Sequence, residues 1–156
     1  MIEACKNHKV HKIVMSSSPS TRFDGRDICG KSADELPIRP PGRFLQAYAE
    51  TKAMGEVACR QACDGKELLT VAIAPHQVYG PRDMLFLHNM LGAGNKLRIF
   101  GSGRNKISLC HVDNYCHGLI LGYEALRPDS PALGKFYIIT DGQAIPFWKA
   151  LDQVRL

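Results

Sequence analysis

The residues in this sequence best suited to chemistry are a tyrosine and a lysine four positions apart, Tyr48 and Lys52. The segment 44–62 around them contains no proline, is rich in good helix formers and is followed by Asp64 and Gly65, so it predicts a long helix. Residues four apart share one face of a helix. A tyrosine is a poor base at neutral pH, but a neighbouring ammonium group favours its phenolate form. The pair therefore predicts proton abstraction from a substrate.

Two apolar runs, one on each side of this helix in the chain, predict strands that position further site residues. Residues 11–15 form a short apolar strand that opens into a serine triplet ending at Ser18. Residues 68–74 form a continuous apolar strand, covered on both faces, that ends at Pro75. In open parallel sheets, ligands bind beyond the carboxyl ends of the strands. Ser18 and Pro75 are therefore expected at one edge of the sheet, together with the tyrosine and the lysine.

The remaining segments continue an alternation of helices and strands, which predicts the α/β class. Residues 21–42 carry many glycines, prolines and charges and predict a loop, with one helical turn at 33–36. Loops of this length in compact domains usually carry function. Further elements are expected as helices at 85–92 and 113–126 and as strands at 97–100 and 136–140.

Composition excludes several classes of protein. The chain has 156 residues, 45% of them hydrophobic, which suffices for one domain or a large part of one. The net charge of +5 includes one short basic run that lacks interleaved aromatic residues, so a nucleic-acid site is not expected. The six cysteines contain no CxxC spacing, which favours reduced thiols over a metal site. The phosphate-loop pattern GRDICGKS at 25–32 lacks the adjoining strand and helix that phosphate binding requires.

Taken in order, these features resemble the extended short-chain dehydrogenase/reductase family, and within it the 3β-hydroxysteroid dehydrogenase group. The resemblance covers nearly the whole chain and rests on five stretches: KIVMSSSPS, AYAETKAMGE, VAIAPHQVYGPRD, IFGSGRNKISLCHVDNYCHG and FYIITDGQAIPFW. The sequences PHQVYGPRD and ITDGQAIPFW are similar to the corresponding stretches of sterol 4α-carboxylate 3-dehydrogenases. The resemblance implies an incomplete Rossmann-like doubly wound parallel sheet, its C-terminal half, with a small substrate-binding region.

The resemblance also implies a role for each site residue. Tyr48 takes the proton of a 3-hydroxyl group while the hydride passes to the cofactor, Ser18 hydrogen-bonds the same oxygen, and Lys52 keeps the tyrosine ionised and binds ribose hydroxyls. The implied cofactor is NAD, with NADP left open, and no metal is implied. The implied substrate is a steroid or sterol, with loss of carbon dioxide after oxidation of a 4α-carboxylate. Cofactor contacts are implied for Tyr48, Lys52, Pro75, His76 and Val78.

For full-length relatives the resemblance implies a homodimer on the cytoplasmic side, at the endoplasmic reticulum membrane or a lipid droplet. No apolar stretch here approaches the ~20 residues that a membrane-spanning helix needs. Membrane association is therefore expected only through segments outside this sequence.

The sequence departs from the family pattern in two features. Ala74 stands where family members commonly carry an arginine before the proline, so the geometry at this end of the sheet is expected to differ. No glycine-rich turn precedes Ser16, although dinucleotide binding in this family requires one. Residues 1–156 are therefore expected to be a partial NAD(P)-binding Rossmann and substrate domain that lacks the N-terminal glycine-rich motif.

Two other interpretations remain open. Another extended family member acting on a nucleotide sugar, such as an epimerase or dehydratase, would share Ser18, Tyr48 and Lys52. Such an enzyme needs basic residues for a diphosphate, whereas residues 84–91 form an apolar stretch that suits either a sterol body or ordinary helix packing. The second alternative is an inactive fragment, kept as a binding or structural module.

Overall fold

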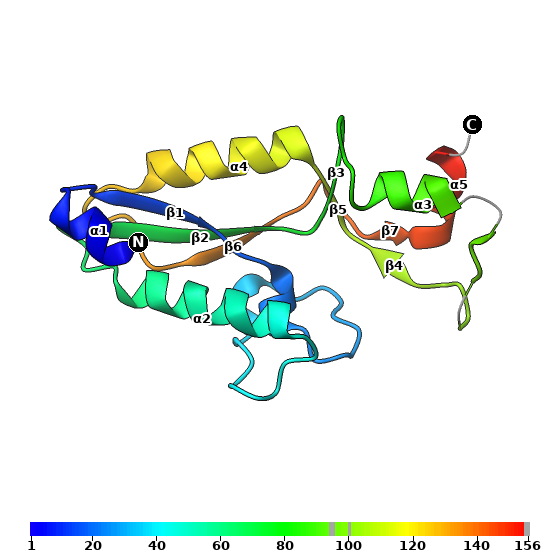
Figure 1. Ribbon diagram of the computed structural model, residues 1–156, viewed down its shortest axis with the longest axis horizontal. Coiled ribbons are helices and arrows are strands. Elements are labelled where there is room, and N and C mark those ends of the chain that lie inside the picture. The colour runs from blue at the N-terminus through cyan, green and yellow to red at the C-terminus, as the bar shows by residue number, and fades with distance from the viewer. Residues whose placement is uncertain (94–95, 100, 155–156) are drawn as a thin grey trace. The chain divides into compact units, whose positions relative to one another are not determined.

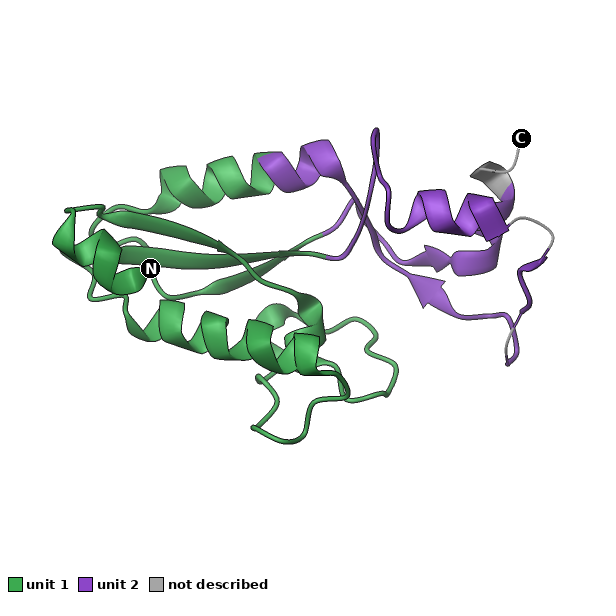
Figure 2. Cartoon of the chain, viewed as in Figure 1, with its two compact units in different colours: residues 1–75, 117–139 green, residues 76–116, 140–156 purple. Residues whose placement is uncertain are grey.

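The computed structural model describes residues 1–93, 96–99 and 101–154. The chain forms two compact units (Figure 2): unit 1 comprises Met1–Pro75 and His117–Ile139, and unit 2 comprises His76–Cys116 and Thr140–Leu156. The chain therefore leaves unit 1 after Pro75, returns to it at His117 and leaves it again after Ile139. Helices and strands alternate in the order expected for an α/β fold.

A three-stranded parallel sheet forms the centre of unit 1. Its strands are β1 (Lys12–Ser16), β2 (Leu69–Pro75) and β6 (Phe136–Ile139), in the order β1-β2-β6. Figure 1 shows α2 (Ala47–Gln61) on one face of this sheet and α4 (Val112–Ala125) on the other. This confirms the parallel sheet and the strands predicted from the two apolar runs.

The side chains of β2 alternate between the two helical layers, which explains why its whole apolar run is buried. Ile73 points toward α4, because a Cβ added at Gly122 would lie 3.2 Å from its side chain. Thr70 points the other way, and its hydroxyl donates a 2.8 Å hydrogen bond to the carbonyl oxygen of Cys59 in α2. Both faces of the central strand are thus covered.

Three short helices complete unit 1. These are α1 (Ile2–Asn7) and the 3₁₀ helices η1 (Pro19–Arg22) and η2 (Ala33–Glu35). The last of these is the helical turn expected within the long loop.

The described residues of unit 2 include two small strand pairs and two α-helices. A parallel pair joins β3 (Gln77–Tyr79) to β5 (Leu109–His111), and an antiparallel pair joins β4 (Lys106–Ile107) to β7 (Ile145–Pro146). The helices are α3 (Leu87–Ala93) and α5 (Phe147–Val154). No helix in the described part of the chain is both long and apolar enough to cross a bilayer.

Two expectations from the sequence require correction. The helix expected from residue 44 begins at Ala47, because Gln46 is still extended and serves as the N-cap residue. The strand expected at 97–100 is wrong for residues 97–99, which pair with no strand in the described part of the chain, and Phe100 lies outside that part. Ile99 is mostly exposed, whereas strand propensity reflects packing on a half-buried sheet surface.

Candidate active site

Tyr48 and Lys52 lie one turn apart at the start of α2. The Lys52 Nζ atom lies 5.9 Å from the centroid of the Tyr48 ring, and it donates a 3.1 Å hydrogen bond to the carbonyl oxygen of Ser16. Since Ser16 is the last residue of β1, this bond holds the ammonium group at the carboxyl end of a parallel strand. Tyr48 is 55% exposed, which leaves its ring open to a ligand.

Ser18 lies two residues beyond the end of β1 and is the N-cap residue of η1, which packs against α2. Its hydroxyl oxygen accepts a 3.3 Å hydrogen bond from the backbone N–H of Ser20 and lies 2.8 Å from the Ser20 hydroxyl oxygen. The structure therefore brings Tyr48 and Lys52 together. Among the described residues, the hydrogen bonds of the Ser18 hydroxyl are to Ser20 rather than to either of them.

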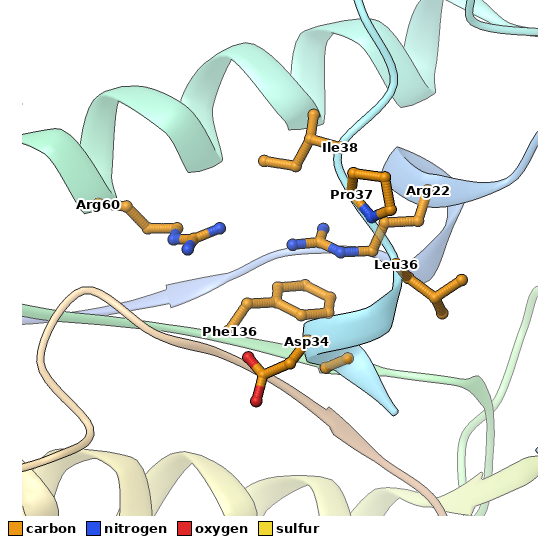
Figure 3. A pocket seen from close by; sticks show the side chains of 8 residues that line it. Arg22, Asp34, Leu36, Pro37, Ile38, Arg60 and Phe136 are labelled. Atoms are coloured by element: carbon orange, nitrogen blue, oxygen red, sulfur yellow. The ribbon is translucent and has the colours of Figure 1, made fainter. Parts of the chain in front are cut away.

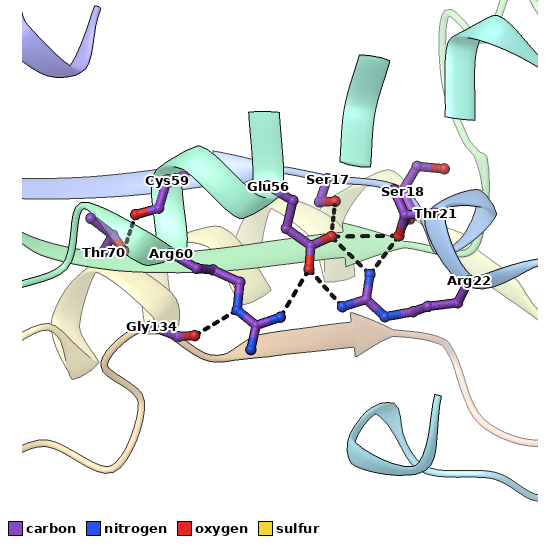
Figure 4. A network of polar contacts seen from close by, with 9 residues as sticks. All are labelled: Ser17, Ser18, Thr21, Arg22, Glu56, Cys59, Arg60, Thr70 and Gly134. Atoms are coloured by element: carbon purple, nitrogen blue, oxygen red, sulfur yellow. Dashed lines mark hydrogen bonds and ion pairs between the residues drawn. The ribbon is translucent and has the colours of Figure 1, made fainter. Parts of the chain in front are cut away.

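A buried carboxylate, Glu56, connects α2 to the segment that follows β1 (Figure 4). Its Oε2 atom accepts a 2.7 Å hydrogen bond from the Ser17 hydroxyl and a 2.8 Å bond from Arg22 Nη1. Its Oε1 atom accepts bonds from Arg22 Nη2 at 2.6 Å and from Arg60 Nη1 at 3.3 Å. Glu56 lies one helical turn after Lys52, and Ser17 directly precedes Ser18. The network therefore fixes the helix against the serine triplet.

The surroundings of Glu56 keep its carboxylate ionised. Burial opposes ionisation, but the hydrogen bonds from Arg22 and Ser17 and the charges of Arg22 and Arg60 outweigh burial, so the pKa of Glu56 lies below its ordinary value. Sequence reasoning did not identify Glu56, Arg22 or Ser17 as site residues. Part of this network could have been predicted, because Glu56 and Arg60 have opposite charges and are four apart on a helix.

Ala74, the departure from the family pattern, is fully buried beside Ala72 and Phe136. The buried cation in this cluster comes instead from Arg22, whose guanidinium carbon lies 3.3 Å from the centroid of the Phe136 ring. Arg22 thus brings a buried cation from η1 to the apolar cluster that contains Ala74.

The residues at and just after the end of β2 that were predicted to contact the cofactor belong to different units. Pro75 is the last residue of β2 and pairs in register with Ile139. His76 belongs to unit 2, where burial lowers its pKa against the opposing effect of a hydrogen bond with the backbone of Ser108. Its Nδ1 atom is buried and has no hydrogen-bond partner in the parts of the chain that are described, and Val78 lies in β3 opposite Cys110.

The apolar stretch 84–91 includes both exposed and packed side chains. Met84, Leu85 and Leu91 are exposed. The Phe86 ring packs against Phe147, with the ring centroids 6.3 Å apart. Phe86 therefore contributes to ordinary packing, whereas Met84, Leu85 and Leu91 present exposed apolar side chains.

The cysteine pair Cys59 and Cys63 contributes to packing at the end of α2. Cys59 is buried, and the Sγ atom of Cys63 accepts a 3.4 Å hydrogen bond from the backbone N–H of Thr70. In residues 1–93, 96–99 and 101–154, no three histidine, cysteine or acidic side chains converge as metal ligands.

Two solved structures share this fold. A dTDP-glucose 4,6-dehydratase from Bacillus anthracis in complex with NAD aligns with a TM-score of 0.74 at 18% identity, over 98% of this chain and 48% of that one. A UDP-glucuronic acid 4-epimerase from Bacillus cereus in complex with UDP-glucuronic acid and NAD aligns with a TM-score of 0.75 at 22% identity, over 98% and 48%. At these identities the likeness establishes the Rossmann-like fold.

Curated relatives are more similar in sequence. The human sterol-4-alpha-carboxylate 3-dehydrogenase, decarboxylating, is 37% identical over 160 residues, which cover 99% of this chain and 42% of the relative. A 2-alkyl-3-oxoalkanoate reductase from Stenotrophomonas maltophilia is 34% identical over 99% of this chain and 47% of the relative. The chain thus spans less than half the length of these relatives. Because the model of the 3-beta hydroxysteroid dehydrogenase/isomerase family matches residues 1–154, this chain belongs to that family.

Proposed function

We propose that this chain supplies catalytic and substrate-binding residues of an oxidoreductase that converts a 3β-hydroxyl group of a steroid or sterol to a ketone, with NAD or NADP as the acceptor. The observation that carries the proposal is the position of the Lys52 ammonium group, beside the Tyr48 ring and bonded to the end of β1. Family membership supports the same reaction class.

The residues present fit a dinucleotide at this position. The Lys52 ammonium has three N–H donors, and the Ser16 carbonyl takes one of them, so two remain for ribose hydroxyls. Pro75 ends the neighbouring strand, where ligands of parallel sheets bind. The nicotinamide ring, when bound, supplies the hydride acceptor. Contacts from His76 and Val78 stay predictions.

In the proposed reaction, Tyr48 and Ser18 act on one substrate oxygen. Tyr48 takes the hydroxyl proton as the general base, with the Lys52 Nζ atom 5.9 Å from the centroid of its ring. When the Ser20 N–H and hydroxyl both donate to Ser18, the hydrogen of the Ser18 hydroxyl remains available to donate to the substrate oxygen. The contacts of Ser18 with Ser20 are therefore compatible with its proposed role.

Two observations favour a sterol over a nucleotide sugar. The human relative at 37% identity is a sterol-4-alpha-carboxylate 3-dehydrogenase, whereas the two structural neighbours that act on nucleotide sugars are 18% and 22% identical. The exposed side chains of Met84, Leu85 and Leu91 offer an apolar surface of the kind that a sterol body requires. With a 4α-carboxylate substrate, the product would be a β-keto acid, which loses carbon dioxide readily.

The test measures NADH or NADPH formation from a 3β-hydroxysterol and its 4α-carboxylate, by this chain and by the longest reading frame that contains it. Conversion of UDP-glucuronic acid is measured by chromatography of the sugar nucleotides, because an epimerase or dehydratase regenerates NAD and accumulates no NADH. We expect turnover of a sterol and a loss of about 10²–10⁴-fold in kcat for Tyr48→Phe. Tyr123→Phe is the matched control, because Tyr123 is also 55% exposed. Turnover of the nucleotide sugar alone, or full activity of Tyr48→Phe, would contradict the proposal. Absence of turnover of every substrate would favour a non-catalytic module.

A further inference from the structure

A pocket of about 140 Å³ lies in unit 1 between the segment 33–38 and the side chains of Arg22, Arg60 and Phe136 (Figure 3). Neither Tyr48 nor Lys52 lines it. In Figure 3 the guanidinium groups of Arg22 and Arg60 point toward one another beside the Phe136 ring. The pocket is therefore lined by neither of these two candidate catalytic residues, and its two cations are the arginines of the Glu56 network.

Within the described part of the chain, one edge of the Arg22 guanidinium group is unpaired although the residue is only 5% exposed. Nη1 and Nη2 donate to the two oxygens of Glu56, and Nη1 also donates to the Thr21 hydroxyl. The Nε atom is buried and has no hydrogen-bond partner among the residues that the structure describes. Nη2 carries a second hydrogen on the same side as Nε–H, so the two groups form a fork that matches two oxygens of an anion. A buried donor without an acceptor is costly, and such a group calls for an explanation.

The charges around the pocket also favour an anion. Arg22 and Arg60 share the single carboxylate of Glu56, so these three buried or half-buried groups carry one net positive charge. Arg60 uses Nε for the Gly134 carbonyl and Nη1 for Glu56. Asp34, which also lines the pocket, is exposed, so solvent screens its opposing charge.

We propose that this pocket binds one small oxyanion, a carboxylate or a phosphate, through the Nε and Nη2 edge of Arg22. The volume suits such a ligand, since a cavity of about 150 Å³ holds a molecule as large as benzene. The bound oxyanion would provide the acceptor that Nε lacks and would balance the positive charge left by Glu56.

The first test follows the ¹⁵Nε–H NMR signal of Arg22 in this chain, assigned by its loss in Arg22→Lys. Acetate and inorganic phosphate are titrated separately, with sodium chloride at equal ionic strength as the control. We expect a saturable shift of the signal with one or both oxyanions and none with chloride, and the stronger binder identifies the class of ligand. An equal shift with chloride, or no saturable shift with either oxyanion, would overturn the proposal.

Two variants test the pocket without touching the Arg22–Glu56 pair. Ala33→Leu adds side-chain volume at the pocket wall and should abolish the shift. Asp34→Asn removes the opposing carboxylate and should tighten binding about two- to fivefold, as expected for one exposed charge. Asp27→Asn, an exposed carboxylate that does not line the pocket, is the matched control. Unchanged binding in both Ala33→Leu and Asp34→Asn would place the anion elsewhere on the chain and refute the assignment.

Discussion

Glu56 is a fully buried carboxylate in a unit whose other core residues are mostly apolar. It is stable there because Arg22, Arg60 and Ser17 all donate hydrogen bonds to it. A buried ion pair of this kind contributes little relative to an apolar replacement, but the loss of one partner leaves uncompensated charge. The network therefore holds α2 against the serine triplet, and the removal of any one charged partner is expected to be strongly destabilising.

We expect Glu56→Gln to lower the free energy of unfolding by about 3 kcal/mol at pH 7, because two guanidinium groups lose their shared anion. The pKa of Glu56 is depressed in the folded chain, so its stabilising effect is present above the unfolded pKa and is lost as pH falls through the folded value. The difference in the free energy of unfolding between the unsubstituted chain and Glu56→Gln should therefore shrink toward acid pH. Urea unfolding between pH 7 and pH 3 measures this difference. Glu67→Gln, at an exposed site, is the control, and a pH-independent gap would contradict the electrostatic explanation.

The residue types and local spacing were enough to predict part of the candidate site. Tyr48 and Lys52 are four apart on one helix, so their proximity follows from helix geometry alone. Arg22 and Glu56 are 34 positions apart, and their contact depends on how η1 packs against α2. Such pairing is tertiary, so no local pattern in the sequence indicates it. The roles of Ser18, Tyr48 and Lys52 in catalysis stay predictions.

At the scale of single elements, α4 approaches the sheet closely because it carries two glycines. A Cβ added at Gly118 would lie 2.9 Å from the Cγ1 atom of Ile139, and one added at Gly122 would lie 3.2 Å from Ile73. A glycine in a helix interior costs about 1 kcal/mol relative to alanine. The close contact with β6 and β2 therefore offsets a propensity that opposes the helix.

We expect Gly118→Ala to destabilise unit 1 by about 1–3 kcal/mol, since the overpacking outweighs the gain in helix propensity. The control is Gly92→Ala in α3, where an added Cβ meets nothing within 4 Å. That change should leave stability unaltered or raise it slightly. Thermal unfolding of both variants checks the prediction, and stabilisation by Gly118→Ala would show that α4 can move away from the sheet.

The elements that the sequence predicted correctly are the long, strongly patterned ones. The buried run of β2 and the helix formers of α2 and α4 appear at nearly the expected positions. The strands β3, β4, β5 and β7 were missed because each has two or three residues, too few for a periodic pattern. The strand expected at 97–100 shows the opposite error, since apolar composition alone does not supply a partner strand.

At the scale of the whole chain, protection of the backbone should differ strongly between strands. β2 is bonded to a strand on each side and all but its last residue is buried, whereas both residues of β7 are exposed. We expect the slowest amide hydrogen exchange in β2 and much faster exchange in the β4–β7 pair. Exchange measured by NMR or mass spectrometry tests this, and equal protection of the two regions would contradict it. The homodimer and the membrane location expected for full-length relatives stay predictions.

The path of the chain between the two units also affects how unit 1 forms during synthesis. In the sheet order β1-β2-β6, the last of these three strands to be translated lies directly beside the central strand β2. Residues 76–135, which include the helix α4, are translated between β2 and β6. In a nascent chain, β2 is therefore an open sheet edge until β6 has left the ribosome. A cell that makes this protein must shield that apolar edge for the time needed to translate the intervening residues.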